Sequence, residues 1–342
     1  MFTSAMINGY RHPFLSEMEG LESGVQKCWH HAPSWPLLHL HSNSRMQSIL
    51  PASIRDLEDV NKTEAFSSWI KLSRTEESLE LRRTIQRVWH GAVASAFQAD
   101  LLARADTPTD RARLFSACVD HSGDWLNAPP ITAVSLRLND EMNRISVGTR
   151  LGARMCELHT YPCGKTVDAR GLHSLSCRKS ATRHQRHSNL NDIIWRVVKR
   201  SQIPAVKEQV GLSRLNGKWP DEATLIPWAS EKALTWNVTL QDTFAQSHVE
   251  DTAILAGAVA NHAATKKISK YQHLTDTNIC VPVAVETGGA WNIQAIEFIE
   301  ELGKRITAVT NEPMDTQYLF QRISIAIQWG NAVSFLKTFS ED

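Results

Sequence analysis

This sequence lacks several features that would assign it to a common class at once. No apolar run among its 342 residues approaches the roughly 20 residues that a membrane-spanning helix needs, so we expect no membrane partner. The first residues, MFTSAMINGYRHPF, are mixed and polar and lack the apolar core of a secretory leader. These absences predict an intracellular protein, either nuclear or cytoplasmic. Internal repeats and low-complexity segments are also missing.

Charge of one sign is not in excess. The 37 Lys and Arg residues are balanced by 36 Asp and Glu residues, which leaves a formal net charge of +1. Overall charge therefore does not indicate a nucleic-acid partner, and any such partner has to be inferred from local patches. The 42% content of hydrophobic residues favours a globular protein, and the length is sufficient for two domains.

Cysteines are few, but three of the six lie between Cys156 and Cys177. In a reducing compartment, clustered Cys and His residues bind metal more often than they form disulfides. Cys156, Cys163, His173 and Cys177 follow the spacing C-x6-C-x9-H-x3-C, and His159 is a possible extra ligand. Thiolates and imidazole at such offsets can surround one structural Zn²⁺ tetrahedrally. The alternative is a set of ordinary buried cysteines with a histidine nearby.

The order of periodic segments predicts an α+β protein in four parts. Apolar residues recur at helical spacing before residue 152, whereas short apolar runs separated by Gly and Pro follow residue 204. From residue 187 onward we predict the order α, β, β, β, α, β, α, with C-terminal helices. The predicted strands cover residues 206–210, 223–228, 234–240 and 278–287, and a long helix covers residues 253–274. The four parts are an irregular segment at 1–60, a helical part at 61–152, a zinc-knuckle-like segment at 153–180 and an αβββαβ core at 181–342.

A basic patch follows the cysteine cluster. Residues 178–187 contain no acid, and such a patch attracts phosphate. The alternative is the solvated start of a helix, and the sequence alone does not decide between the two. The candidate nucleic-acid contacts are Arg178, Lys179, Arg183, Arg186 and His187.

A second group of residues has the composition of a nuclease site. Metal-dependent cleavage of phosphodiesters needs carboxylates that hold a divalent cation such as Mg²⁺, and a lysine beside the attacking water. Asp221 follows Pro220 at a predicted hairpin turn, and the adjacent predicted strand, LTWNVTL, carries Asn237. A Pro-Asp pair alone is weak evidence, because such an Asp most often caps backbone amides in a turn.

Further members of this candidate site come from neighbouring segments. Lys267 and Lys270 lie on the predicted long helix, and Glu208 lies on the strand before the hairpin. The lysines could equally form the solvated face of an amphipathic helix. The predicted αβββαβ order around these residues favours the nuclease interpretation.

Several stretches together resemble one known group of proteins. Among them are VDARGLHSLSCRKS, NGKWPDEATLIPW, LTWNVTLQDTFAQSH and VPVAVETGG, and they occur in the right order between about residues 111 and 339. These stretches look like the C-terminal region of reverse-transcriptase-type open reading frames of non-long-terminal-repeat retrotransposons. The resemblance implies a zinc knuckle, a restriction-like endonuclease of the PD-(D/E)xK class with Mg²⁺ as its cofactor, and DNA or RNA as partners.

Two departures from that group weaken the expected activity. The chain has Asn237 where the relatives usually have Asp, so one charged metal ligand is lost, and Asp242 lies on the wrong strand face to replace it. Tyr161 stands where the relatives tend to have a zinc-binding cysteine. No Asp-Asp pair occurs, which excludes a reverse-transcriptase palm site. We therefore expect a truncated, retroelement-derived protein with an impaired endonuclease-like domain. The alternative is a non-catalytic nucleic-acid-binding remnant or a domesticated binding module.

Overall fold

The computed structural model describes residues 94–339, with gaps at residues 96, 135, 178, 181, 208–219 and 221. The irregular segment predicted at residues 1–60 lies outside the described residues, as does the part of the predicted helical segment 61–152 that precedes residue 94. Arg178, Glu208 and Asp221 also lie outside them. Within the described ranges, no helix combines the length and the apolar character that crossing a membrane would require.

The described residues form a mixed α+β structure, which confirms the predicted class. A two-stranded sheet pairs β1 (His159–Thr160) with β2 (Thr166–Val167), and a second sheet contains four strands. Its strands are β3 (Ala205–Lys207), β4 (Glu222–Ala229), β5 (Lys232–Gln241) and β6 (Asn278–Glu286). The α-helices are α6 (Pro108–Cys118), α7 (Asp140–Leu151), α8 (His173–Ser176), α9 (Thr182–Arg200), α10 (Val249–Thr252), α11 (Ala258–Tyr271), α12 (Ile293–Thr310) and α13 (Asp315–Leu336). The described part of the chain also contains three short 3₁₀ helices, η1 (Asp124–Asn127), η2 (Thr132–Val134) and η3 (Gln272–Leu274), and residues 94–95 and 97–103 are helical as well.

The larger sheet has the strand order β3-β4-β5-β6. The first three strands form an antiparallel meander, and β6 runs parallel to β5. A parallel neighbour requires a crossover connection, which α10 and α11 supply. Ser230 and Glu231 join β4 to β5, and both have a positive φ (48° and 62°), as a two-residue hairpin turn with the right twist requires.

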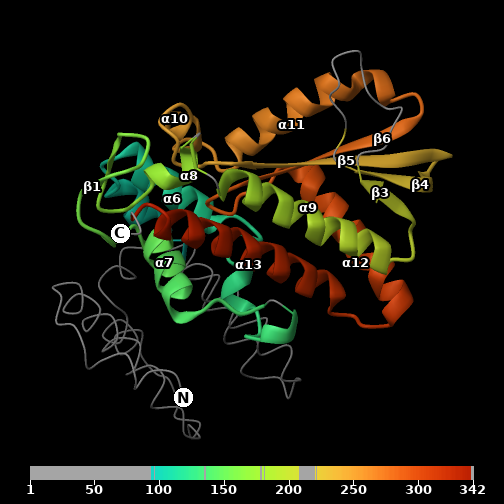
Figure 1. The fold of residues 1–342 in the computed structure, drawn as a ribbon, viewed down its shortest axis with the longest axis horizontal. Helices are drawn as coiled ribbons and strands as arrows, with labels where there is room; N and C mark the ends of the chain where they lie inside the picture. Colours follow the sequence, from blue (N-terminus) through green and yellow to red (C-terminus); the bar gives the residue numbers. More distant parts are fainter. Residues whose placement is uncertain are drawn as a thin grey trace, which may run out of the picture. The chain divides into compact units, whose positions relative to one another are not determined.

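Helices cover both faces of this sheet (Figure 1). α9, α12 and α13 lie on one face and α11 lies on the other. Side chains alternate along each strand, so Val283 and Val285 join the large core beneath α9, α12 and α13, whereas Ala284 packs against α11. The large core also contains Trp236, which is 1% exposed and lies 6.3 Å from the ring of Phe298.

The helix ends follow local capping rules. The side chain of Asn139 accepts a hydrogen bond from the Met142 amide at the start of α7, and Gly152 ends that helix in the left-handed conformation. The helix predicted at residues 253–274 begins five residues later in the structure, because Gly257 has φ +78° and directly precedes α11, and its last three residues form the 3₁₀ helix η3. The predicted strands at residues 223–228, 234–240 and 278–287 correspond to β4, β5 and β6, with ends that differ by one or two residues.

Candidate functional site

Asn237 lies in the middle of β5, on the face that α11 covers. The large core holds Trp236 and Val238, so the alternation of side chains turns Asn237 to the opposite face. The parallel register places Pro282 of β6 directly beside it. Asn237 is 3% exposed, so a side chain at position 237 is shielded from bulk water.

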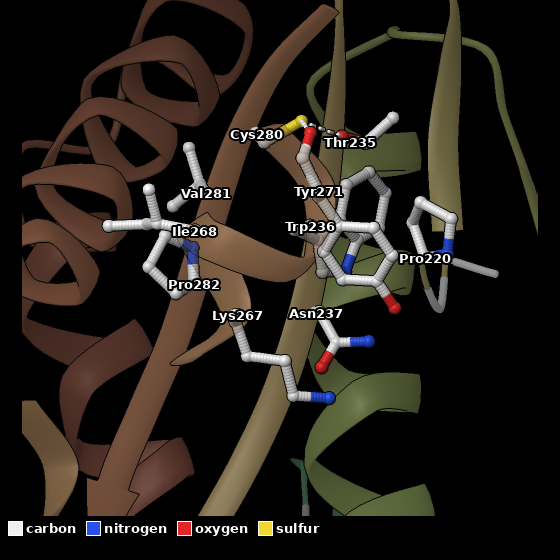
Figure 2. A pocket seen from close by; sticks show the side chains of 10 residues that line it. All are labelled: Pro220, Thr235, Trp236, Asn237, Lys267, Ile268, Tyr271, Cys280, Val281 and Pro282. Atoms are coloured by element: carbon white, nitrogen blue, oxygen red, sulfur yellow. Dashed lines mark hydrogen bonds between the residues drawn. The ribbon is translucent and has the colours of Figure 1, made fainter. Parts of the chain in front are cut away.

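Lys267 reaches the same place from α11. A pocket with about 230 Å³ of open volume is lined by Asn237, Lys267, Pro220, Tyr271 and Pro282, together with neighbouring residues. Figure 2 shows the Lys267 side chain extending alongside the carboxamide of Asn237, with Pro220 on the other side of the Tyr271 ring. Residues as far apart in the chain as Pro220 and Pro282 therefore meet in one pocket.

Lys270, the other predicted lysine, is directed elsewhere. Its Nζ donates a hydrogen bond of 2.6 Å to the hydroxyl of Tyr271 and lies 4.4 Å from the centre of that ring. Lys270 is not among the residues that line the pocket of Asn237. The structure therefore separates the two lysines, and Lys267 is the one that faces Asn237.

Glu222 is a buried carboxylate that we did not predict. It is 1% exposed and pairs across the strands with Trp236, so it lies on the α9 face of the sheet, opposite to Asn237. Its Oε1 accepts a hydrogen bond of 3.1 Å from Asn191 and lies 4.0 Å from Nζ of Lys207. The alternation of side chains along the strand after the Pro-Asp pair could have indicated which face of the sheet Glu222 occupies. It could not have indicated that Asn191 of α9 and Lys207 of β3 are the partners of Glu222.

Asp242 does not replace the missing acid at position 237. The register between β5 and β6 runs without a shift as far as Gln241, and Asp242 follows the end of the strand. Asp242 accepts hydrogen bonds from Thr287 Oγ1 at 2.8 Å and from the Phe244 amide at 3.2 Å. Burial raises its pKa, and these hydrogen bonds only partly offset the effect.

Three of the predicted metal ligands come together. Their ligand atoms (Sγ of Cys163, Sγ of Cys177 and a ring nitrogen of His173) all lie within 4.8 Å of one another. The Cys163 Sγ is 3.1 Å from Nε2 of His173. The loop between β1 and β2 carries Cys163, and the short helix α8 brings His173 and Cys177 to it. This group could bind a metal ion.

Cys156 and His159 do not join this group, which corrects the expectation that one of them completes the ligand set. The Cys156 thiol donates to the Asp168 carbonyl at 3.3 Å, and its side chain packs against a different apolar cluster. The His159 ring stacks on Phe339, with the ring centres 4.8 Å apart, and its Nδ1 lies 2.9 Å from the Glu157 carbonyl.

Tyr161 packs directly against the metal-binding group. It is 5% exposed, clusters with Cys163 and Cys177, and meets the His173 ring edge-on at 5.3 Å. Burial lowers the pKa of His173, which favours the neutral imidazole that a metal ion needs. Burial raises the pKa of the Cys177 thiol, and the neighbouring Cys163 adds to this shift.

The basic patch divides into exposed and buried members. Lys179 and Arg183 are exposed, as a contact to nucleic acid would require. Arg186 is 5% exposed, and its guanidinium donates to the Leu175 carbonyl at 2.7 Å and to Asn331 at 3.3 Å. Its assignment to the surface patch is therefore wrong, because these partners on α8 and α13 hold it inside. His187 is partly buried, with Nε2 3.0 Å from the Val238 carbonyl.

Comparison with known proteins adds no assignment. No protein-family model and no curated protein matches this sequence. The function therefore has to be argued from the geometry of the pocket and of the metal-binding group.

Proposed function

We propose that residues 181–342 form a restriction-endonuclease-like domain of retroelement origin that binds nucleic acid. In this domain, Asn237 impairs metal-dependent DNA cleavage. The observation that carries the proposal is the meeting of Asn237 and Lys267 in one pocket that Pro220 also lines. The order of α9, β3, β4, β5, α11 and β6 supports it, since it is the αβββαβ order that the resemblance implies.

The chemistry of position 237 supports the impairment. A divalent cation in such a pocket would polarise the scissile phosphate and lower the pKa of the attacking water. An amide offers a neutral oxygen where a carboxylate would offer a charged one, so the affinity for a hard cation falls. The described lining residues include no carboxylate. A Mg²⁺ ion would therefore depend on Asp221 and Glu208, which lie outside the described residues.

Lys267 has a separate role in this proposal. Its ammonium group lies beside Asn237 (Figure 2), where it would stabilise the negative charge that develops on a bound phosphodiester. Lys270 is held by Tyr271 and has no such role. The two lysines are three residues apart on α11, so they form a matched pair for mutagenesis.

We further propose that the metal-binding group holds a structural Zn²⁺. Two thiolates and one imidazole are donors that Zn²⁺ prefers. Cys163, His173 and Cys177 supply this set, and their ligand atoms already converge. With Tyr161 packed against the group, the protein would provide three ligands instead of the usual four, so we expect weaker binding than in a complete zinc knuckle.

A nicking assay on supercoiled plasmid with Mg²⁺ or Mn²⁺ tests the endonuclease proposal. The unaltered protein should not nick the plasmid, and Asn237→Asp should gain activity. Adding Lys267→Ala to Asn237→Asp should abolish the gain, whereas adding Lys270→Ala should preserve it. If the unaltered protein nicks the plasmid and Asp221→Ala abolishes nicking, the proposed impairment is wrong.

The second candidate is a binding module without catalysis. It is favoured by Lys179 and Arg183, which are exposed near the metal-binding group and could contact phosphates. Gel shifts at several salt concentrations would detect it. If Asn237→Asp gains no nicking activity but the protein still binds DNA or RNA with a steep salt dependence, this candidate replaces the first.

A further inference from the structure

A second hollow lies on another part of the molecule, where α6, α7, η1 and the turn after β6 meet. Together with the solvent at its mouth it encloses about 320 Å³ of empty space, and its lining includes Arg113, Ser116, Trp125, Arg150 and Gln328. A neighbouring hollow of about 210 Å³ shares Arg113, Thr149 and Phe244 with it and also contains Arg170. The shared residues show that the two hollows adjoin.

The arginines around these hollows outnumber their acidic partners. Arg170 pairs with Asp110 through both guanidinium nitrogens, at 2.9 and 3.2 Å, and Arg113 lies 3.5 Å from the same carboxylate. Within the described ranges Arg150 has no acidic partner, since it donates only to the carbonyls of Ala117 and Ser122, at 2.8 and 3.1 Å. Three cations therefore share one described carboxylate.

Two buried hydrogen-bond donors line the larger hollow without a partner among the described residues. Ser116 is 1% exposed and Trp125 is 5% exposed, yet neither the Ser116 hydroxyl nor the Trp125 Nε1–H meets an acceptor there. A buried polar group without a hydrogen-bond partner is energetically unfavourable, so an acceptor that enters the hollow would be stabilised there. The backbone at Gly288 lies close to Ser116, and only glycine fits there, because a Cβ at position 288 would lie 2.8 Å from the Cβ of Ser116.

We propose that this hollow binds a phosphate group, with Arg150, Ser116 and Trp125 as its donors. A phosphate group carries negative charge, and its several oxygens only accept hydrogen bonds, so one group can satisfy a guanidinium, a hydroxyl and an indole together. The arginines around the hollows, which outnumber their acidic partners, attract this negative charge. This site is formed by residues other than those around Asn237, and it does not depend on the endonuclease proposal. The phosphate comes either from a nucleic-acid backbone or from a free nucleotide or inorganic phosphate.

The indole N–H resonance of Trp125 provides a direct measurement. The resonance is assigned by its loss in Trp125→Phe and is then followed by ¹H–¹⁵N NMR during titration of the full chain. The titrants are inorganic phosphate, a nucleoside monophosphate and a short DNA duplex. We expect at least one of them to shift the resonance, because its oxygen replaces a missing acceptor.

Variants then test the individual donors. Ser116→Ala removes one unpartnered hydroxyl with little change in volume and should weaken binding about tenfold, since a hydrogen bond to a charged group is lost. Arg150→Gln should weaken binding at least as much. Arg144→Gln is the matched control on the same helix, because Arg144 is exposed and pairs with Glu141. The control should leave binding unchanged.

The outcomes also separate the two sources of phosphate. A shift by DNA alone, with a DNA affinity that falls in Ser116→Ala, assigns the site to a nucleic-acid backbone. A shift by inorganic phosphate or nucleotide, with DNA affinity unchanged in Ser116→Ala, assigns it to a free phosphate. The proposal is overturned if no titrant moves the Trp125 resonance, or if Arg144→Gln weakens binding as much as Arg150→Gln.

Discussion

Removing the guanidinium of Arg186 should lower the thermal stability of the protein and should not affect the proposed binding of nucleic acid. The Arg186 side chain passes Gly330 of α13 closely, since a Cβ on Gly330 would lie 2.6 Å from its Cγ. Its two hydrogen bonds, to Leu175 and Asn331, connect α9 to α8 and α13. Arg186→Met keeps the aliphatic stem and removes only the charged group and its hydrogen bonds.

The expected cost follows from these contacts. A hydrogen bond to a charged group contributes about 1.5–3 kcal/mol, so the loss of both hydrogen bonds should cost about 3–6 kcal/mol. Because Tm falls by about 2–4 °C for each kcal/mol in a domain of 150–250 residues, we expect a decrease of about 6–24 °C. Circular dichroism during heating measures this decrease directly.

Arg183 provides the control for this prediction. It lies three residues before Arg186 on the same helix and is exposed, so Arg183→Met should change the stability by no more than about 0.5 kcal/mol. If nucleic acid binds at the exposed patch, the same change should reduce the salt dependence of binding by about one phosphate contact. The reasoning is refuted if Arg186→Met leaves Tm unchanged and reduces the salt dependence as Arg183→Met does.

Three further predictions concern other parts of the structure. Cys177→Ser should lower the zinc content measured by metal analysis, and Cys156→Ser should not; equal losses would contradict the assigned ligand group. Burial raises the pKa of Asp242, so the contribution of this carboxyl to the free energy of unfolding falls as the pH rises above its ordinary pKa of 3.8. Asp242→Asn should therefore gain stability relative to the unaltered protein as the pH rises above that value, as measured by urea unfolding. A difference that stays constant with pH would refute this. Gly303→Ala should destabilise the protein by about 1–3 kcal/mol, because the added Cβ would lie 2.2 Å from the Thr316 hydroxyl and 2.8 Å from the Thr316 Cα. Urea unfolding measures this change, and an unchanged midpoint would show that α12 and α13 can move apart at no cost.

The segments that the sequence predicted most reliably are those with a strong period. Alternation along LTWNVTL predicted a strand, and in the structure the same alternation turns Trp236 into the large core and Asn237 toward α11. The start of α11 was predicted five residues too early, because a single glycine inside an Ala-rich helical pattern is tolerated in many helices. In the structure, the positive φ of Gly257 marks that start.

The sequence indicated which types of residue form the candidate sites, but it did not indicate which of these residues lie next to one another. The spacing of the cysteines indicated a metal-binding group. It did not distinguish Cys156, whose thiol is hydrogen-bonded to a backbone carbonyl, from the two cysteines that lie beside His173. A run of arginines indicated a surface patch, but it did not reveal that Arg186 is buried. The sequence did not indicate the hollow around Arg150, because its three proposed donors come from three separate elements.

What the sequence determined by itself is the kind and order of the secondary structures and the face of each strand that a residue occupies. These properties follow from backbone geometry over a few residues, where a period of two or of 3.6 can be read directly. Which arginine is buried, which lysine lies beside Asn237 and which thiols converge were decided by tertiary structure alone. They depend on helix packing and strand register, which bring together side chains that are dozens of residues apart in the chain.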